Sequence, residues 1–155
     1  MKYQAALIVV EDIEKSRQLY EKVLDQKVKS DYGENVTFLG DFSIHQKAHF
    51  QNLIQDRPII QRSNSSELYF EHDDLPSIVS KIQNLGLELL HGIVEQPWKQ
   101  QVVRFYDYDK NLIEIGESLE HVASRLAKQE YSIEEICKIT YLDQQTVKQA
   151  IQKYS

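Results

Sequence analysis

The sequence has very little of what marks secreted, membrane-spanning or nucleic-acid-binding proteins. Its single cysteine, Cys137, cannot form an internal disulfide, and the residues after Met1 lack the apolar core of a signal peptide. The longest apolar run, residues 5–10, is far shorter than the roughly 18–20 residues that cross a bilayer. Acidic residues outnumber basic ones by 24 to 18, and no cluster of lysine and arginine provides affinity for a phosphate backbone. We therefore expect a cytoplasmic protein that uses neither a membrane nor a nucleic acid.

The composition that remains is that of a globular protein with a packed core. Hydrophobic residues make up 41% of the 155 residues and charged residues 27%, which is too apolar for a disordered chain. A chain of this length buries roughly 68–70% of its unfolded surface and has room for one medium domain or two small modules.

The first third of the chain predicts a strand, a helix and three further strands. Residues 5–10 are uniformly apolar and partly β-branched, which is typical of a buried strand. Asp12 follows as a helix N-cap ahead of an apolar stripe with near-helical spacing. Short strand candidates lie at residues 27–29, 36–39 and 42–45, separated by turn-forming Asp, Asn and Gly.

The second third repeats this order after a polar linker at residues 61–66. A strand at residues 68–71 precedes a helix that begins at Asp74, with Pro76 in its first turn, and that ends at Gly86. The following strands are expected at residues 87–90, 102–106 and 112–115, the last two joined as a hairpin. The repeat of one order in two segments indicates an internal duplication.

The hairpin segment RFYDYDKNLIEI, residues 104–115, resembles the closing hairpin R-F-x-D-P-D-G-N-x-x-E of the glyoxalase / bleomycin-resistance / extradiol-dioxygenase superfamily. Tyr108 and Lys110 stand where Pro and Gly are usual, which favours a looser turn, although Asn111 is able to take a left-handed conformation. The resemblance implies an α+β domain over residues 1–118. Its two βαβββ modules, residues 3–50 and 66–117, would form curved mixed sheets around a cleft.

The resemblance also implies positions for a metal site. Metal-dependent members hold a divalent ion with four residues of the inner strands, and these positions fall on Ala5, His45, Glu67 and Glu114. Ala5 has no donor, but the other three could still hold Ni, Zn, Mn or Fe, and either carboxylate could act as a catalytic base. Arg104 shares their sheet face by strand alternation, so we expect it to pair with Glu67 or Glu114 and the cavity to hold no tightly bound metal.

Alternation also predicts the lining of the cleft. Tyr69 and Glu71 share a face with Glu67, Tyr106 shares a face with Arg104, and Trp98 lies in the loop before the closing strands. Such an aromatic and polar lining suits a small planar or amphipathic organic ligand. The remaining histidines are expected to be solvated or hydrogen-bonded, namely His49, His72, His91 and His121.

Residues 119–155 predict a separate helical tail. Ser132 and Glu135 form a capping box, and Asp143 caps a last helix, so the two final helices look like a helix-turn-helix hairpin. The hairpin lacks a basic face, which favours packing onto the main body or a partner subunit over DNA binding. We expect the ligand chemistry to lie outside this tail.

The sequence leaves the function open between three possibilities. The cleft could serve a glyoxalase-like lyase or isomerase, or a dioxygenase, which needs the metal and a carboxylate base. It could equally serve a protein that sequesters a small molecule, working as a homodimer. Alternatively, the protein is an interaction or regulatory protein with a degenerate cavity, acting through its helical hairpin.

Overall fold

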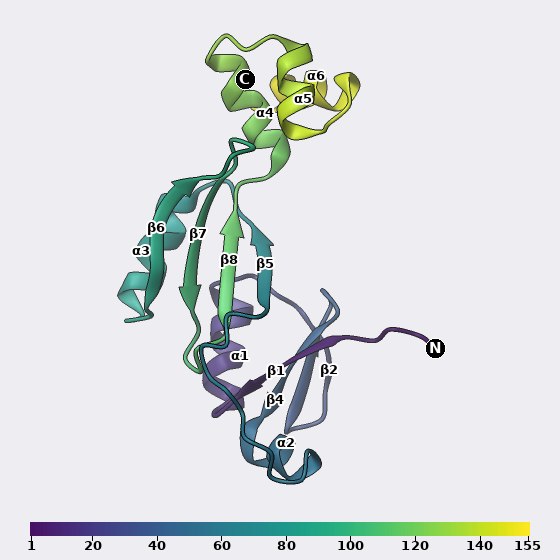
Figure 1. Cartoon of the computed structure of the whole chain (residues 1–155), viewed down its shortest axis with the longest axis vertical. Helices are drawn as coiled ribbons and strands as arrows, with labels where there is room; N and C mark the ends of the chain where they lie inside the picture. The colour runs from purple at the N-terminus through teal and green to yellow at the C-terminus, as the bar shows by residue number, and fades with distance from the viewer. The chain divides into compact units, whose positions relative to one another are not determined.

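Two four-stranded sheets organise the chain, which the computed structural model describes in full from Met1 to Ser155. In spatial order the first sheet contains β1 (Ala6–Val10), β4 (Phe42–Gln46), β3 (Asn35–Phe38) and β2 (Val28–Asp31). The second contains β5 (Glu67–Glu71), β8 (Leu112–Gly116), β7 (Gln101–Tyr106) and β6 (Leu89–Glu95). The fourth strand lies beside the first in both sheets (Figure 1), which confirms the predicted duplication and the α+β fold class.

Residue contacts divide the chain into two compact units, and the first consists of Met1–Glu67 and Tyr106–Leu112. Its sheet pairs β1 with β4 in parallel, while β3 is antiparallel to β4 and to β2. Helix α1 (Ile13–Lys22) packs on this sheet and begins at the predicted cap, where the Asp12 carboxylate accepts a hydrogen bond from Lys15 N at 3.0 Å.

A short helix that the sequence did not predict follows the first sheet. This helix, α2 (Lys47–Leu53), is capped by the side chain of Gln46, whose Oε1 accepts from His49 N at 2.8 Å. Glutamine is not a usual N-cap, and none of the seven helical residues is buried. The segment therefore lacks both the cap and the apolar stripe by which a helix is detected in a sequence.

The turn between β7 and β8 is organised by one buried carboxylate. Asp107 Oδ1 accepts backbone hydrogen bonds from Asp109 and Asn111, and its Oδ2 accepts from the hydroxyl of Tyr20 at 3.0 Å. Burial raises the pKa of Asp107, although these donors oppose the shift. The left-handed residue of the turn is Lys110, at φ 66°, and not Asn111, for which the sequence allowed that conformation. Lys110 thus stands in the position and the conformation of the usual glycine.

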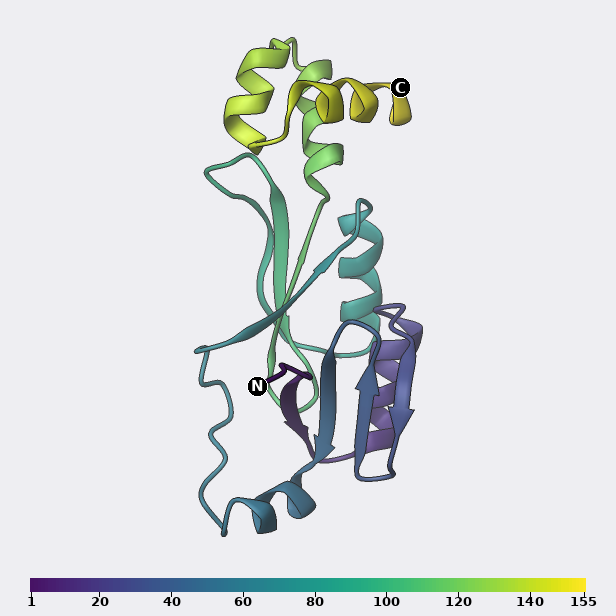
Figure 2. The ribbon, with the colours of Figure 1, turned by 90° about the vertical axis from the view of Figure 1, so that its right-hand side faces the viewer.

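The second unit consists of Leu68–Phe105 and Ile113–Ser155. Helix α3 (Leu75–Asn84) lies against one face of its sheet (Figure 2) and buries Leu75, Ile78 and Ile82. Both predicted boundaries of this helix are confirmed, since Asp74 caps its start and Gly86 follows its end in the left-handed conformation, at φ 67°.

The tail forms three helices with a core of their own: α4 (Leu119–Lys128), α5 (Ile133–Thr140) and α6 (Gln144–Lys153). The predicted capping box of Ser132 and Glu135 is present, and Asp143 caps α6. Six buried residues make up the tail core: Val122, Ala123, Leu126, Ile136, Val147 and Ala150. Contacts nevertheless group the tail with the second sheet in one unit. None of the six helices is long and apolar enough to span a bilayer.

Candidate functional site

A pocket of about 720 Å³ lies in the second unit, between the sheet and the tail. The sheet side contributes Tyr69 and Glu71 from β5, together with Trp98 and Gln100 from the segment before β7. Three of these four, Tyr69, Glu71 and Trp98, are residues that the sequence predicted as ligand-binding. A volume of this size falls within the range that small-molecule sites occupy.

Gln100 holds the two aromatic rings of the sheet wall in place. Its side-chain amide is buried, with 5% exposure. Nε2 donates hydrogen bonds to the Tyr69 hydroxyl at 2.8 Å and to the backbone oxygen of Glu117 at 2.7 Å, and Oε1 accepts from Trp98 Nε1 at 2.9 Å. Both rings are thus fixed through their polar atoms, which leaves their faces available to the pocket.

Tyr69 is held in its neutral form. Partial burial, reinforced by the hydrogen bond that its hydroxyl donates to Glu71 at 3.0 Å, raises the pKa of Tyr69 to about 12. The hydroxyl therefore keeps its proton at physiological pH, and it can donate to Glu71 while accepting from Gln100.

The end of β8 has room for this arrangement only because residue 116 is glycine. A Cβ atom at Gly116 would lie 2.8 Å from Gln100 Nε2 and 3.2 Å from Tyr69 Cε2. Both separations are shorter than ordinary van der Waals contact, so any larger residue would push the Gln100 amide or the Tyr69 ring out of place.

The tail side of the pocket comes from residues that we expected to carry no ligand chemistry. Leu119 and Ile139 contribute apolar surface, Lys138 contributes an ammonium group and Tyr141 contributes a ring. Tyr141 caps the end of α5 at φ 60° with 90% exposure. This left-handed position normally belongs to Gly or Asn, and a bulky residue there costs about 1–2 kcal/mol.

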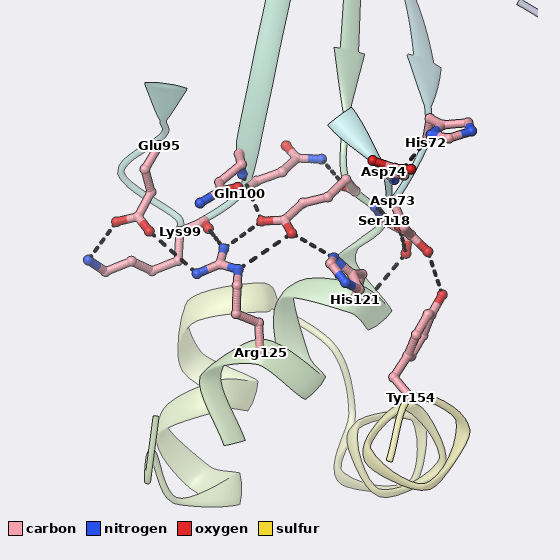
Figure 3. A network of polar contacts seen from close by, with 12 residues as sticks. His72, Asp73, Asp74, Glu95, Lys99, Gln100, Ser118, His121, Arg125 and Tyr154 are labelled. Carbon is pink, nitrogen blue, oxygen red and sulfur yellow. Dashed lines mark hydrogen bonds and ion pairs between the residues drawn. The ribbon is translucent and has the colours of Figure 1, made fainter. Parts of the chain in front are cut away.

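A polar network, here called the clamp, fastens the tail to the sheet beside this pocket. It consists of Asp73, Glu117, Ser118, His121, Arg125 and Tyr154. In Figure 3, His121 and Arg125 of α4 and Tyr154, the residue that follows α6, point toward the end of the second sheet.

Two carboxylates accept most of the hydrogen bonds of the clamp. Glu117 is buried, with 2% exposure. Its carboxylate accepts hydrogen bonds from the Arg125 guanidinium and from Gln101 N at 2.8 Å, and it pairs with His121 Nδ1 at 2.8 Å. Asp73 accepts from Ser118 and from the Tyr154 hydroxyl at 2.7 Å. Burial opposes ionisation of Asp73, but these donors outweigh it and lower its pKa.

The predicted pairing of Arg104 is confirmed on the same sheet. The Arg104 guanidinium forms an ion pair with the buried carboxylate of Glu114. The Glu114 side chain is 8% exposed and that of Arg104 is 24% exposed, so the pair is partly shielded from water. Of the two carboxylates that were expected to form an ion pair with Arg104, Glu114 does so.

In the first unit, His45 lies in a chain of ring nitrogens. Asn35 Nδ2 donates to His45 Nδ1 at 3.0 Å, so neutral His45 carries its proton on Nε2 and donates to His49 Nδ1 at 2.7 Å. Burial, and then the neighbouring His49, lowers the pKa of His45. Both ring nitrogens of His45 are therefore engaged within this unit.

Comparison with known proteins places the chain in a family. Residues 3–120 match the family model described as a glyoxalase-like domain. This chain belongs to the glyoxalase-like domain family. A protein of unknown function from Agrobacterium tumefaciens str. C58 is 33% identical, with a TM-score of 0.66 over 76% of this chain and 94% of that one. No curated protein gives a significant match.

Two further solved structures share the fold of the glyoxalase-like domain. The fosfomycin resistance protein FosX from Mesorhizobium loti is 22% identical, with a TM-score of 0.54 over 74% of this chain and 89% of that one. A glyoxalase/bleomycin resistance protein/dioxygenase family enzyme from Burkholderia phytofirmans PsJN is 15% identical, with a TM-score of 0.63 over 76% of this chain and 98% of that one. The family match ends at residue 120, so the pocket residues Lys138, Ile139 and Tyr141 lie beyond the glyoxalase-like domain.

Two of the three donors that the family implies for a metal site are engaged in other contacts. Neither unit places three or more His, Cys, Asp or Glu side chains so that they could hold a metal ion. Glu114 is paired with Arg104, and both nitrogens of His45 are hydrogen-bonded. The third expected ligand, Glu67, is the exposed first residue of β5, and whether it converges with the other two stays a prediction.

The sequence named three residues that line this pocket, but it placed them in a cleft of the two modules and did not predict a pocket against the tail. Tyr106 does not line it, because its hydroxyl donates to Asn64 at 2.8 Å in the first unit. Gln100 and Gly116 were missed, since an isolated glutamine and an isolated glycine give no pattern in a sequence. Tyr141 was missed as well, and only its place immediately after a capped apolar helix could have marked it.

Proposed function

We propose that this protein binds a small organic molecule in the pocket between its second sheet and its tail, and that binding needs no metal. One observation carries the proposal: the buried amide of Gln100 fixes the rings of Tyr69 and Trp98 before any ligand arrives. Binding sites whose aromatic walls are already rigid lose little conformational entropy when they bind a ligand, so they bind more tightly.

Sequestration has more support than catalysis. A glyoxalase-like lyase, isomerase or dioxygenase would draw on Glu114 or Glu67 as base and metal ligand. Glu114 instead forms an ion pair with the Arg104 guanidinium, so its use as a base or a metal ligand would break that pair. The pocket meanwhile offers ring faces and apolar side chains, which hold a ligand without activating it.

The sole tryptophan makes a direct test possible. Because Trp98 is the only tryptophan in the chain, its fluorescence reports on the pocket alone. We expect quinoline, a planar neutral probe, to quench it with one-to-one saturation, and we expect the affinity to be unchanged after treatment with EDTA.

Gln100→Ala should weaken quinoline binding about fivefold, because about 1 kcal/mol of ring preorganisation is lost. Gln83→Ala, at an exposed position of α3, is the matched control and should bind as the parent does. Absence of saturable quenching, or equal affinities for the two variants, would show that the pocket is not the binding site. Loss of binding after EDTA would overturn the metal-free part of the proposal.

A further inference from the structure

We propose that the ligand of this pocket is a planar aromatic zwitterion, with a protonated amine at one end for Glu71 and an anionic group at the other for Lys138. This inference rests on the proposed binding function and names the chemical class that the pocket takes. It gives the tail a direct part in recognition, because one of the two charges comes from the sheet and the other from α5.

Most polar atoms around the pocket are already committed to the protein. The Tyr69 hydroxyl, the Trp98 indole nitrogen and both polar atoms of the Gln100 side chain are hydrogen-bonded to one another or to the backbone. The buried Thr140 hydroxyl donates to the backbone oxygen of Ile136 at 2.8 Å. What these residues present to a ligand is therefore ring and methyl surface, and this favours a planar apolar body.

Two charged groups are left to recognise the ends of such a body. Glu71 accepts one hydrogen bond, from Tyr69 to Oε1, so its Oε2 can accept another from an ammonium group. Lys138 lines the other wall from an exposed position on α5, where its ammonium can pair with an anion. A ligand with a single charge would use only one of these two groups.

Tyr141 supplies independent support that the tail wall is built for a ring. It is the only aromatic residue of the chain in the left-handed conformation, at φ 60°, and its side chain remains 90% exposed. The Tyr141 ring does not pack against the tail core, so core packing does not account for a tyrosine at this strained position. A stacking surface opposite the sheet wall accounts for the residue.

The test uses isothermal titration calorimetry on the full chain with three matched probes. Norfloxacin has a planar bicyclic body with a piperazinium and a carboxylate at opposite ends. Its ethyl ester lacks the anion, and its N-acetyl derivative lacks the cation. Because Glu71 and Lys138 are both exposed, each charge changes the binding affinity only modestly. We expect norfloxacin to bind about three- to fivefold more tightly than either derivative.

Two variants test which protein residue binds which charged end of the ligand. Glu71→Gln should abolish the preference for norfloxacin over the N-acetyl derivative and keep its preference over the ester. Lys138→Met should abolish the preference for norfloxacin over the ethyl ester and keep its preference over the N-acetyl derivative. Glu134→Gln and Lys148→Met make the same charge changes at exposed tail positions outside the pocket and should leave both preferences intact.

The outcomes separate this inference from the binding function on which it rests. If quinoline binds but the three norfloxacin probes bind equally or not at all, the pocket is a binding site and the zwitterion assignment is wrong. Pocket variants that behave like their controls overturn the assignment too. If no planar probe binds at all, the proposed function fails and the assignment fails with it.

Discussion

At the scale of single residues, the chemistry of the pocket depends on one neutral amide. A glutamine can donate and accept at once, and Gln100 uses both capacities between two rings and a carbonyl oxygen. Glutamate in its place would set a carboxylate against the backbone oxygen of Glu117. Leucine would leave the Trp98 indole nitrogen without its acceptor, and Tyr69 would keep only its hydrogen bond to Glu71. The choice of residue therefore follows from the donors and acceptors around it.

The raised pKa of Tyr69 predicts a loss of stability in alkali. A folded-state pKa of about 12 lies above the unfolded value of about 10, so the contribution to stability is complete below pH 10 and is lost as the pH rises toward 12. Since Tyr69 is 46% exposed, we expect solvent screening to limit the loss to about 1 kcal/mol.

Urea unfolding between pH 8 and pH 12 measures this effect. Tyr69→Phe should show a shallower decline than the parent, because phenylalanine cannot ionise. Tyr3→Phe, at a residue 73% exposed, is the control and should decline as the parent does. A parent and a Tyr69→Phe protein with superimposable pH profiles would contradict the prediction.

At the scale of elements, α5 combines a strong start with a strained end. Its start has a complete capping box, in which Ser132 Oγ accepts from Glu135 N while Glu135 accepts from Ser132 N. Its end places Tyr141 where Gly or Asn is usual. The helix is therefore stable enough to hold an unfavourable residue at the pocket.

Tyr141→Gly should change stability and binding in opposite directions. Relief of the left-handed strain should stabilise the protein by about 1 kcal/mol, and loss of the ring should weaken quinoline binding. Thermal unfolding and Trp98 fluorescence titration measure the two effects separately. Tyr141→Phe keeps the ring and the strain and should match the parent in both. A glycine variant that is less stable, or that binds as the parent does, would show that the tyrosine serves the fold.

At the scale of the whole second unit, the clamp makes the pocket depend on the docking of the tail. Arg125 does not line the pocket, yet its guanidinium bonds the buried Glu117 carboxylate and the backbone oxygen of Lys99. The tail has a core of its own, and the hydrogen bonds of the clamp connect it to the sheet that Lys138 and Tyr141 face. Polar contacts of this kind can be weakened without unfolding either partner.

Arg125→Met should loosen the tail and weaken ligand binding at a distance. The change leaves the Glu117 carboxylate without its guanidinium, so we expect faster amide exchange in α4 to α6 and a several-fold lower affinity for quinoline. Hydrogen exchange read by mass spectrometry and the fluorescence titration provide the two measurements.

Lys148→Met, at an exposed position of α6, is the control that removes one positive charge without touching the clamp. As the limiting case, truncation before His121 should leave a folded body by circular dichroism but remove most of the tail wall. Unchanged exchange and unchanged affinity in Arg125→Met would show that the clamp does not hold the pocket together.

The sequence by itself determined the features that depend on neighbours along the chain. The caps at Asp12, Asp74 and Asp143, the stop at Gly86 and the order of most helices and strands along the chain were readable because each depends on residues no more than a few positions apart. Strand alternation, a period of two residues, was enough to place Arg104 on one face with Glu67 and Glu114, and the structure pairs it with Glu114.

Only the tertiary structure decided where the pocket lies and what builds it. Gln100 bonds Tyr69 across 31 residues, and Asp73 bonds Tyr154 across 81, so no local pattern announces either contact. The docking of the tail likewise depends on polar partners brought together from separate elements. Local spacing fixes which face a side chain occupies, but which groups then meet across that face is set by packing between distant segments.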